Sequence, residues 1–527
     1  PRVRVGSREP EFKTADNTGD RFWRRGRRKT SSAGTALGSA AGRRRFSFSL
    51  PAIDFSAMAR SARQAGLTIK QTMQDMRHYP AAVVGLLIIA ILLAISIYTV
   101  IAIPYQEAIT LWRGDDGLWN RNPRDALPLW VNLFRSDDLP PTLTSNSMVA
   151  GVDEKISELG EGVTDVTYTF TFDYDYVHFP QDIIFDITAD YEERGPHVTI
   201  TWVWEDGSEQ ELTSFQPRFS DSYYVSRDER LQRRLARLSG SRAETASGTT
   251  PTAESPHETI LRGPDGEAAG PVPGTYTLRV NALHFEPESD LEVVVTILGQ
   301  VYGLAGTDAQ RRDLMIALLW GTPIALAFGL VAAVFTSVGG MVVAAVGAWY
   351  GGLIDRGIQF LTEVNLILPF FPVALMIFTL YSRNIVTILA VVVALSLLGS
   401  AVKTFRATFL QVRGSPYIEA ARAYGASNWR IVSRYLIPRI ITVLVPMMII
   451  LVPTYVFLEA TLAFLGVSDP HLPTWGKLVV AALSYGVHAN AAHIVIAPFG
   501  LLFLTGFAFA MVGITLERIL EPRLQET

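Results

Sequence analysis

The stretch EAARAYGASNWRIVSRYLIPR, residues Glu419–Arg439, is polar and basic, although long apolar segments flank it on both sides. Gly425 is suited to end a helix in a left-handed conformation, and Ser427 is a good N-cap for a helix that follows. Pro438 is expected to close this second helix before the next apolar segment, because proline disrupts a helix interior. The stretch therefore predicts two short helices divided by a bend.

The first of these helices has features of a docking element. Tyr417, Ala421 and Tyr424 share one face by their i, i+4, i+7 spacing. Glu419 lies near the N-terminus, where the helix dipole favours a carboxylate, and it is spaced to pair with Arg422. An amphipathic loop helix resting on lipid headgroups explains the same features equally well, so the residues alone leave both interpretations open.

The flanking apolar segments indicate a membrane protein with a water-exposed part. Hydrophobic residues make up 49% of the 527 residues and charged residues 18%. About 20 consecutive apolar residues cross the hydrocarbon core of a bilayer. On this criterion we predict six transmembrane helices, a first one within residues 80–104 and five more near 320–348, 358–381, 385–402, 439–466 and 493–515.

The charge distribution predicts which side of the membrane each part occupies. Basic residues strongly outnumber acidic ones in residues 1–79, whereas acidic residues outnumber basic ones in residues 105–312. Because basic segments stay on the cytoplasmic side, we expect a cytoplasmic, partly disordered N-terminal region and an extracytoplasmic region 105–312. The arginine-rich loop 403–438 and the C-terminus then also fall on the cytoplasmic side. The chain has no cysteine, which excludes disulfides and thiolate metal sites and is compatible with a bacterial protein.

Residues of about 150–300 predict a β-rich domain inserted between the first and second spans. Five stretches in it, DVTYTFTFDYDYV, DIIFDITADY, HVTITWVW, GTYTLRVNALHF and LEVVVTIL, alternate apolar and polar residues or are rich in β-branched ones. About six short strands favour a small sandwich-like fold. Residues 238–274 form a polar segment between strands that is expected to be flexible.

Several motifs carry a resemblance to a known family. EAARAYGA, followed by the Ile-Pro pair at residues 437–438, resembles the EAA loop of membrane subunits of binding-protein-dependent ABC importers. Four further stretches are similar, in the same order, to motifs of the dipeptide, oligopeptide and nickel branch of that family: GTDAQRRD (306–313), YGGLIDRGIQFLTEV (350–364), FLEATLAFLGVSDPHLPTWGKLV (457–479) and LERILEPRL (516–524). The resemblance covers residues 300–527 almost continuously.

The resemblance implies a fold, a mechanism and partners. The fold is the six-helix permease fold of type I importers, here over residues 313–527 together with the first span. A second homologous permease completes the translocation path, two cytoplasmic ATPase subunits hold ATP and Mg, and an extracytoplasmic binding protein delivers substrate. The EAA helix inserts into a groove of the ATPase, and the implied coupling residues here are Glu419, Ala420, Ala421, Arg422 and Gly425.

The chain departs from the family pattern at several points. Arg311 replaces the glycine expected in the Gly-Thr-Asp motif, Tyr435 stands where many members have histidine, and Ile437 replaces the leucine before proline. The inserted domain of about 150–300 has no counterpart in the typical member, and the motifs do not explain it.

Two carboxylates within predicted spans are candidates for the translocation path or the permease interface, since a carboxylate inside a membrane is by default a hypothesis of function. Glu459 is expected either to face that path or the partner permease, or to form a structural hydrogen bond within the helix bundle. Glu363 lies close to Arg356 in sequence, and a pair between the two near the membrane surface is expected. In the predicted outer loop, Pro473, Trp475 and Gly476 are candidate contacts for the binding protein, although an interfacial tryptophan anchor explains Trp475 almost as well.

Other chemistries find no support in the residues. The sequence lacks the Gly-x-x-x-x-Gly-Lys-Ser/Thr loop that cradles ATP phosphates, no catalytic constellation stands out, and the histidine spacing suits no metal site. Nothing in the charge balance suggests nucleic acid as a partner. We therefore interpret the chain as a non-enzymatic, multi-pass permease subunit of a peptide-type or nickel-type importer in a bacterial inner membrane. A membrane-anchored sensor with an extracytoplasmic ligand-binding domain and an exporter-type permease are the alternatives.

Overall fold

The structure, a computed structural model, describes residues 74–114, 117–149, 152–160, 163–238, 255–264, 268–486 and 492–520. Residues 1–73 of the predicted basic region, residues 239–254 and 265–267 of the polar segment 238–274, and the C-terminal residues 521–527 therefore lie outside the described residues.

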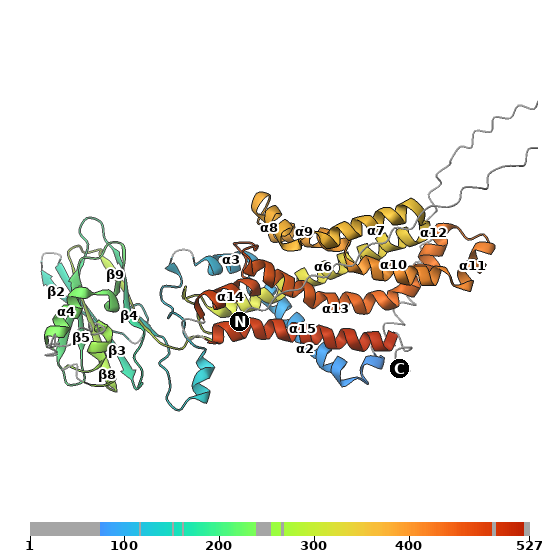
Figure 1. The fold of residues 1–527 in the computed structure, drawn as a ribbon. Helices are drawn as coiled ribbons and strands as arrows, with labels where there is room; N and C mark the ends of the chain where they lie inside the picture. Colours follow the sequence, from blue (N-terminus) through green and yellow to red (C-terminus); the bar gives the residue numbers. More distant parts are fainter. Residues whose placement is uncertain are drawn as a thin grey trace, which may run out of the picture. The chain divides into compact units, whose positions relative to one another are not determined.

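Four helices are long and apolar enough to cross a membrane. They are α2 (Pro80–Ala102), α6 (Leu314–Tyr350), the helical run Asn428–Phe464, and α15 (Ala492–Leu520). Figure 1 shows α13 (Ile437–Phe464) lying between α6 and α15, and α2 packs against α6 and α15.

Two further pairs of apolar helices are bent. The first is α7 (Gly352–Ile367) with α8 (Phe370–Leu380), bent by 83°, and the second is α9 (Ile385–Leu397) with α10 (Ser400–Arg413), bent by 43°. Pro369 explains the first bend, because the residue before a proline is driven out of the helical region, and Leu368 is indeed extended, with ψ 130°. The described chain thus has four candidate spans, and six if each bent pair is one span.

The predicted end of the second short helix at Pro438 is wrong. The segment passes without a break from α12 (Asn428–Ile431) through a π-helical turn, η4 (Val432–Leu436), into α13. In this turn the N–H of Ile437 bonds to the carbonyl of Val432. A π-turn changes the hydrogen-bond register, so that a proline without an N–H is accommodated at the start of α13.

The β-rich domain is confirmed as two antiparallel sheets. One has the order β1-β9-β4-β7 and the other β2-β3-β8-β5-β6. Buried side chains of both sheets form one core, in which Trp202, Phe185 and Ile200 are fully buried, as in a β-sandwich. The strands are β1 (Leu143–Asn146), β2 (Asp153–Gly160), β3 (Val163–Tyr174), β4 (Asp182–Asp190), β5 (His197–Val203), β6 (Glu209–Phe215), β7 (Ser220–Tyr224), β8 (Gly274–His284) and β9 (Asp290–Leu298).

Short helices complete the described fold. Within or beside the sandwich lie η3 (Val225–Arg227), α4 (Glu229–Leu238) and α5 (Pro256–Leu261), and before it lie α3 (Tyr105–Arg113) and η2 (Leu129–Phe134). Two helices follow α10 and α13, namely α11 (Pro416–Ala423) and α14 (Trp475–Ala481), and the latter continues into the π-turn η5 (Ala482–Gly486).

Candidate coupling site

The bend between α11 and α12 has the predicted geometry. Gly425 adopts φ +74°, its N–H bonds to the carbonyl of Arg422 at 2.9 Å, and the N–H of Ala426 bonds to the carbonyl of Ala421 at 3.0 Å. These two bonds and the left-handed residue make a Schellman motif. Ser427 caps α12 by accepting a hydrogen bond from the N–H of Arg430 at 3.4 Å. The roles predicted for Gly425 and Ser427 are therefore confirmed.

The helix α11 buries one face and exposes the other. Ile418 and Ala421 are its buried residues, whereas Glu419, Ala420, Arg422 and Gly425 are exposed. Of the three residues predicted to share a face, Tyr417, Ala421 and Tyr424, only the alanine is buried. Tyr424 is 92% exposed, and Trp429 beyond the bend is 70% exposed. Most of the predicted coupling residues thus lie on a surface that a partner can reach.

Arg422 does not form the predicted pair with Glu419. No ion pair joins these two side chains among the described residues, and the guanidinium of Arg422 lies over the ring of Trp349, 4.7 Å from its centroid. Arg413 lies on the same ring at 6.0 Å and donates a hydrogen bond to the carbonyl of Ala348 at 2.6 Å. These cation–π contacts connect α11, through Arg422, and α10, through Arg413, to the C-terminal end of α6.

A cluster of buried residues, here called the α11 support cluster, lies under the helix. It unites side chains from α6, α10, α11, α12, η4 and α13, namely Met341, Ala344, Ala345, Ala348, Trp349, Val402, Phe405, Phe409, Val412, Ile418, Ala421, Ile431, Leu436, Ile440 and Leu444. The cluster thereby joins α11 to α6, α10 and α13 through close-packed contacts. Neither Trp349 nor Ile418 was identified from the sequence in this role.

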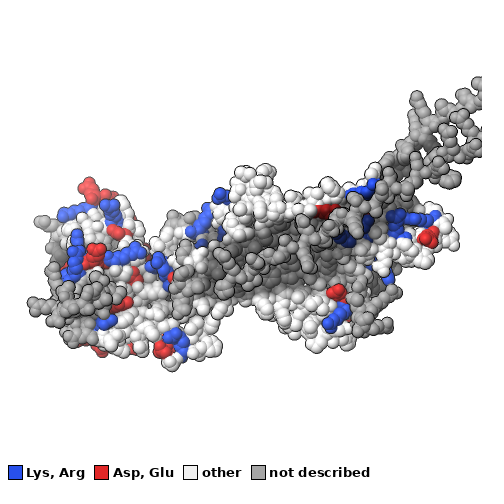
Figure 2. Space-filling view, viewed as in Figure 1, with Lys and Arg blue, Asp and Glu red and all other residues white. Residues whose placement is uncertain are grey.

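Charged pairs add a second connection between helices. Arg406 of α10 binds Asp355 of α7 in a bidentate arrangement, with Nε–Oδ1 and Nη2–Oδ2 distances of 2.7 and 2.5 Å. Glu363 of α7 pairs at 3.7 Å with Lys403 of α10, and not with Arg356 as predicted. Both members of the second pair are largely exposed, at 62% and 43%, so it contributes little. In Figure 2, charged side chains gather around α11, while the visible surface of the neighbouring helices is mostly uncharged.

Glu459 is buried, at 6% exposure, and faces a neighbouring helix of the same chain. Its carboxylate interacts with the side chains of Thr474 and Lys477. Thr474 in turn caps α14 by accepting from the N–H of Lys477. This arrangement favours the structural interpretation of Glu459, as a bond between α13 and α14.

The candidate contacts Pro473, Trp475 and Gly476 are buried, and this corrects the prediction that they touch a docked protein. Trp475 is 0% exposed, and its indole N–H donates to the carbonyl of Leu318 in α6 at 3.1 Å. A Cβ at Gly321 would lie 2.2 Å from Cδ1 of Trp475. The glycine is therefore required for the tryptophan to reach α6, and burial also excludes the role of an interfacial anchor.

The turn before α6 shows why Arg311 replaces a glycine. Arg311 adopts φ +66°, a conformation that glycine adopts at no cost. Its guanidinium donates to the carbonyls of Asn120 and Asn122 at 3.0 and 2.9 Å, and Asn122 Nδ2 donates back to the carbonyl of Arg311 at 3.1 Å. The arginine thus keeps the glycine-like backbone and adds side-chain bonds to the turn.

In the part of the chain that the structure describes, no group of three or more His, Asp or Glu side chains is arranged to hold a metal ion. The arrangement at α11 is suited to mechanical contact: an exposed short helix, a rigid bend and a packed cluster that ties it to membrane helices. These features define a multi-pass membrane protein with an exposed short helix, α11, at one end of its membrane helices.

Comparison with known proteins is consistent with this class. Residues 336–526 match the family described as binding-protein-dependent transport system inner membrane component. A putative peptide transport system permease protein of Brucella suis is 30% identical over 225 residues, which cover 42% of this chain and 74% of the relative. The oligopeptide transport system permease protein OppC of Escherichia coli is 30% identical over 221 residues, 41% of this chain and 72% of the relative.

The chain belongs to the family of inner-membrane permease components of binding-protein-dependent ABC transport systems. A glutathione transport system permease protein of Pectobacterium atrosepticum is also similar, at 28% identity over 221 residues, 42% of this chain and 72% of that protein. The β-sandwich, whose strands run from residue 143 to residue 298, lies outside the residues that match the family description.

Proposed function

We propose that this chain is one of two permease subunits of an ATP-driven importer for peptides or related small solutes. A second, homologous permease forms the translocation path with it, two ATPase subunits dock on the cytoplasmic side, one of them at α11, and a binding protein delivers the solute on the opposite side. The family match and the peptide and oligopeptide transport relatives support this proposal. ATP and Mg are bound by the ATPase subunits, and this chain converts their movement into rearrangement of its spans.

The observation that carries the proposal is the two-faced helix α11. Its exposed side presents the small side chain of Ala420 beside Glu419, so that another protein can approach the helix closely. Its buried side, through Ile418 and Ala421, is part of a cluster shared with α6, α10 and α13. A push on the exposed side therefore moves three membrane helices together, which is what a coupling helix requires.

The distribution of charge gives the orientation of this arrangement. The loop that contains α11 is rich in arginine, as are residues 1–79, and basic loops remain in the cytoplasm. With α11 in the cytoplasm, the turn before α6 and the β-sandwich lie on the extracytoplasmic side, because α6 connects the two ends as one helix of 37 residues. Both chain termini are then cytoplasmic, and the protein is a multi-pass component of the inner membrane.

The test uses the complex that the chain forms with its ATPase subunits in membrane vesicles. Ala420→Trp places a bulky ring on the exposed side of α11, and we expect it to abolish uptake and to uncouple ATP hydrolysis from transport while the chain still folds. The matched control is Ala236→Trp, which changes an exposed alanine on α4 of the β-sandwich. Unimpaired uptake of a labelled dipeptide by Ala420→Trp would rule out docking at α11.

A further inference from the structure

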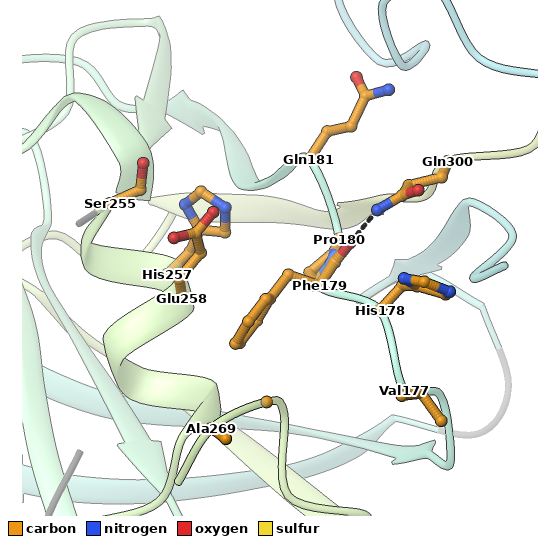
Figure 3. Close-up of a pocket in the computed structure, with 11 residues that line it drawn as sticks. Val177, His178, Phe179, Pro180, Gln181, Ser255, His257, Glu258, Ala269 and Gln300 are labelled. Carbon is orange, nitrogen blue, oxygen red and sulfur yellow. Dashed lines mark hydrogen bonds between the residues drawn. The ribbon is translucent and has the colours of Figure 1, made fainter. Parts of the chain in front are cut away.

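The β-sandwich contains a cavity of about 570 Å³ that the permease function does not use. Figure 3 shows that its lining comes from four places: the segment between β3 and β4, the first turn of α5, the segment between α5 and β8 that contains Ala269, and Gln300 shortly after the end of β9. A volume of this size falls in the range of small-molecule sites. The question is which of its polar groups are free to bind a ligand.

Two lining side chains are already engaged within the protein. His178 Nε2 bonds to Oδ2 of Asp137 at 2.6 Å. Gln181 binds the backbone of Arg124 through both atoms of its amide, at 2.7 Å each. These groups shape the wall and have little capacity left for a ligand.

His257 is the clearest unpaired group. The residue is 3% exposed, and its Nδ1 has no hydrogen-bond partner. The ring also forms a hydrogen bond to the backbone of Pro180. Since proline has no N–H, the imidazole must donate this bond to the carbonyl.

Burial lowers the pKa of His257, although the carboxylates of Asp182 and Glu258 oppose this effect. The lowered pKa favours the neutral form of the ring, in which a nitrogen without a proton is a hydrogen-bond acceptor.

The remaining free groups are also acceptors. The carboxylate of Glu258 has no hydrogen bond or ion pair with any described residue and lies on the same turn of α5 as His257 (Figure 3). Gln300 donates through its amide nitrogen to the carbonyl of Phe179 at 2.8 Å, which leaves its Oε1 as an acceptor. Ser255 makes no side-chain cap on α5, so its hydroxyl is free as well.

One carboxylate lines the cavity and another lies near it. Asp182, which does not line the cavity but acts on His257, is 6% exposed and is bonded to neutral donors, namely the N–H groups of Ile183 and Ser226 and the Ser226 hydroxyl. With Glu258 this gives two carboxylates without an ion-pair partner among the described residues, while the guanidinium of Arg262 lies over the ring of the lining residue Phe179, 5.4 Å from its centroid. A ligand with positive charge and several hydrogen-bond donors satisfies the acceptors of this lining, and unpaired buried acceptors are costly.

We propose that this cavity binds the protonated amino group of a small organic amine, either the N-terminus of a short peptide or a free alkylamine. An ammonium group has three donors and no acceptor, which matches the acceptors in the lining, namely the carboxylate of Glu258, Gln300 Oε1 and the hydroxyl oxygen of Ser255. A bare Ca²⁺ ion fits less well, since it takes six to eight oxygen ligands. The inference does not rest on the proposed transport function, because the cavity lies within the β-sandwich.

The test is titration calorimetry on the full chain, purified in detergent. The probes are dialanine, putrescine, N-acetyl-dialanine, which lacks the ammonium group, and CaCl₂. We expect saturable binding of dialanine or putrescine and none of the acetylated peptide. Binding of dialanine alone identifies a peptide N-terminus as the ligand, and binding of putrescine alone identifies a free alkylamine.

Glu258→Gln is expected to weaken binding at least tenfold, because it removes the charge while it keeps the shape, and it leaves no partner unsatisfied. The matched control, Glu288→Gln, changes an exposed glutamate that does not line the cavity, and it should bind as the unmodified chain does. The comparison separates this cavity from any solute site in the translocation path. Binding of Ca²⁺ alone, equal binding of the acetylated peptide, no binding of either amine, or an unchanged affinity in Glu258→Gln would each overturn the proposal.

Discussion

The two ends of helix α6 are built differently. At its N-terminal end, Trp475 is fully buried against Leu318 and Gly321, and Arg311 bonds the preceding turn to Asn120 and Asn122. At its C-terminal end, Trp349 supports Arg422 of α11, and beyond it the side chains of Tyr424 and Trp429 remain exposed. The side chains at the N-terminal end are therefore packed and bonded within the chain, whereas Tyr424 and Trp429 beyond the C-terminal end are accessible to a partner.

Burial thus distinguishes structural residues from candidate contact residues of the same type. Trp475 and Trp429 both lie in segments that resemble functional motifs of the family, and the sequence cannot distinguish them. The structure assigns Trp475 to packing and leaves Trp429 on the surface. Substitutions at the two ends are therefore expected to affect different properties of the protein.

The largest effect is expected from the two tryptophans. Trp475→Ala removes a fully buried ring and should reduce the free energy of unfolding by about 3–5 kcal/mol, the range for such cavities. Trp429→Ala, at a site 70% exposed, should change it by less than about 0.5 kcal/mol. Thermal unfolding of the detergent-purified chain measures both. Equal losses in the two variants would contradict the distinction between the ends.

Gly425 gives the next largest effect. A Cβ there would meet no other atom, but φ is +74°, so Gly425→Val strains the backbone by about 1–2 kcal/mol and straightens or loosens the bend. We expect reduced coupling of ATP hydrolysis to uptake, with the rest of the fold intact. Gly425→Asn is the control, since asparagine tolerates this conformation. If valine and asparagine supported equal uptake, the bend would not require a left-handed residue.

The two ion pairs between α7 and α10 should differ in how much they stabilise the fold, but by less than the two tryptophans do. Arg406→Lys keeps the charge but loses the two-bond fork to Asp355, because lysine is a point donor, and we expect a loss of stability of about 1 kcal/mol. Lys403→Ala breaks the exposed pair with Glu363 and should have almost no effect. Chemical unfolding in detergent compares the two, and a larger loss in Lys403→Ala would reverse this ranking.

Arg311→Gly is expected to have the smallest effect. Glycine relieves the cost of φ +66° but removes two hydrogen bonds to backbone carbonyls, so the net change should stay within about 1 kcal/mol. Arg311→Val keeps the strain and loses the bonds, and it should be clearly less stable. A thermal unfolding series of the three chains provides the measurement. A glycine variant as unstable as the valine variant would show that the bonds dominate.

The β-sandwich shows which strands a sequence can reveal. The five stretches identified from alternation are β3, β4, β5, β8 and β9, and all of them are interior strands. The four that were missed, β1, β2, β6 and β7, are the edge strands of the two sheets. Edge strands bury fewer side chains, so their apolar periodicity is weak, and only pairing with a neighbour identifies them.

The candidate coupling site was predictable where its geometry is local. The roles of Gly425 and Ser427 depend on residues a few positions apart, and both are confirmed. The burial of Trp475 depends on Gly321, which is distant in the sequence, and the partner of Glu363 lies on another helix. Such contacts between remote segments carry no local signal, so these two predictions were wrong.

The most direct measurement uses the absence of cysteine from the chain. Ala420→Cys, labelled with a cysteine-reactive photo-crosslinker in membranes that contain the assembled complex, reports what touches the exposed side of α11. We expect a covalent product with an ATPase subunit, whose yield changes when ATP is added, and no such product from Glu288→Cys. If position 420 instead crosslinks only to lipid while the complex remains active in uptake, the account of α11 as the coupling helix is contradicted.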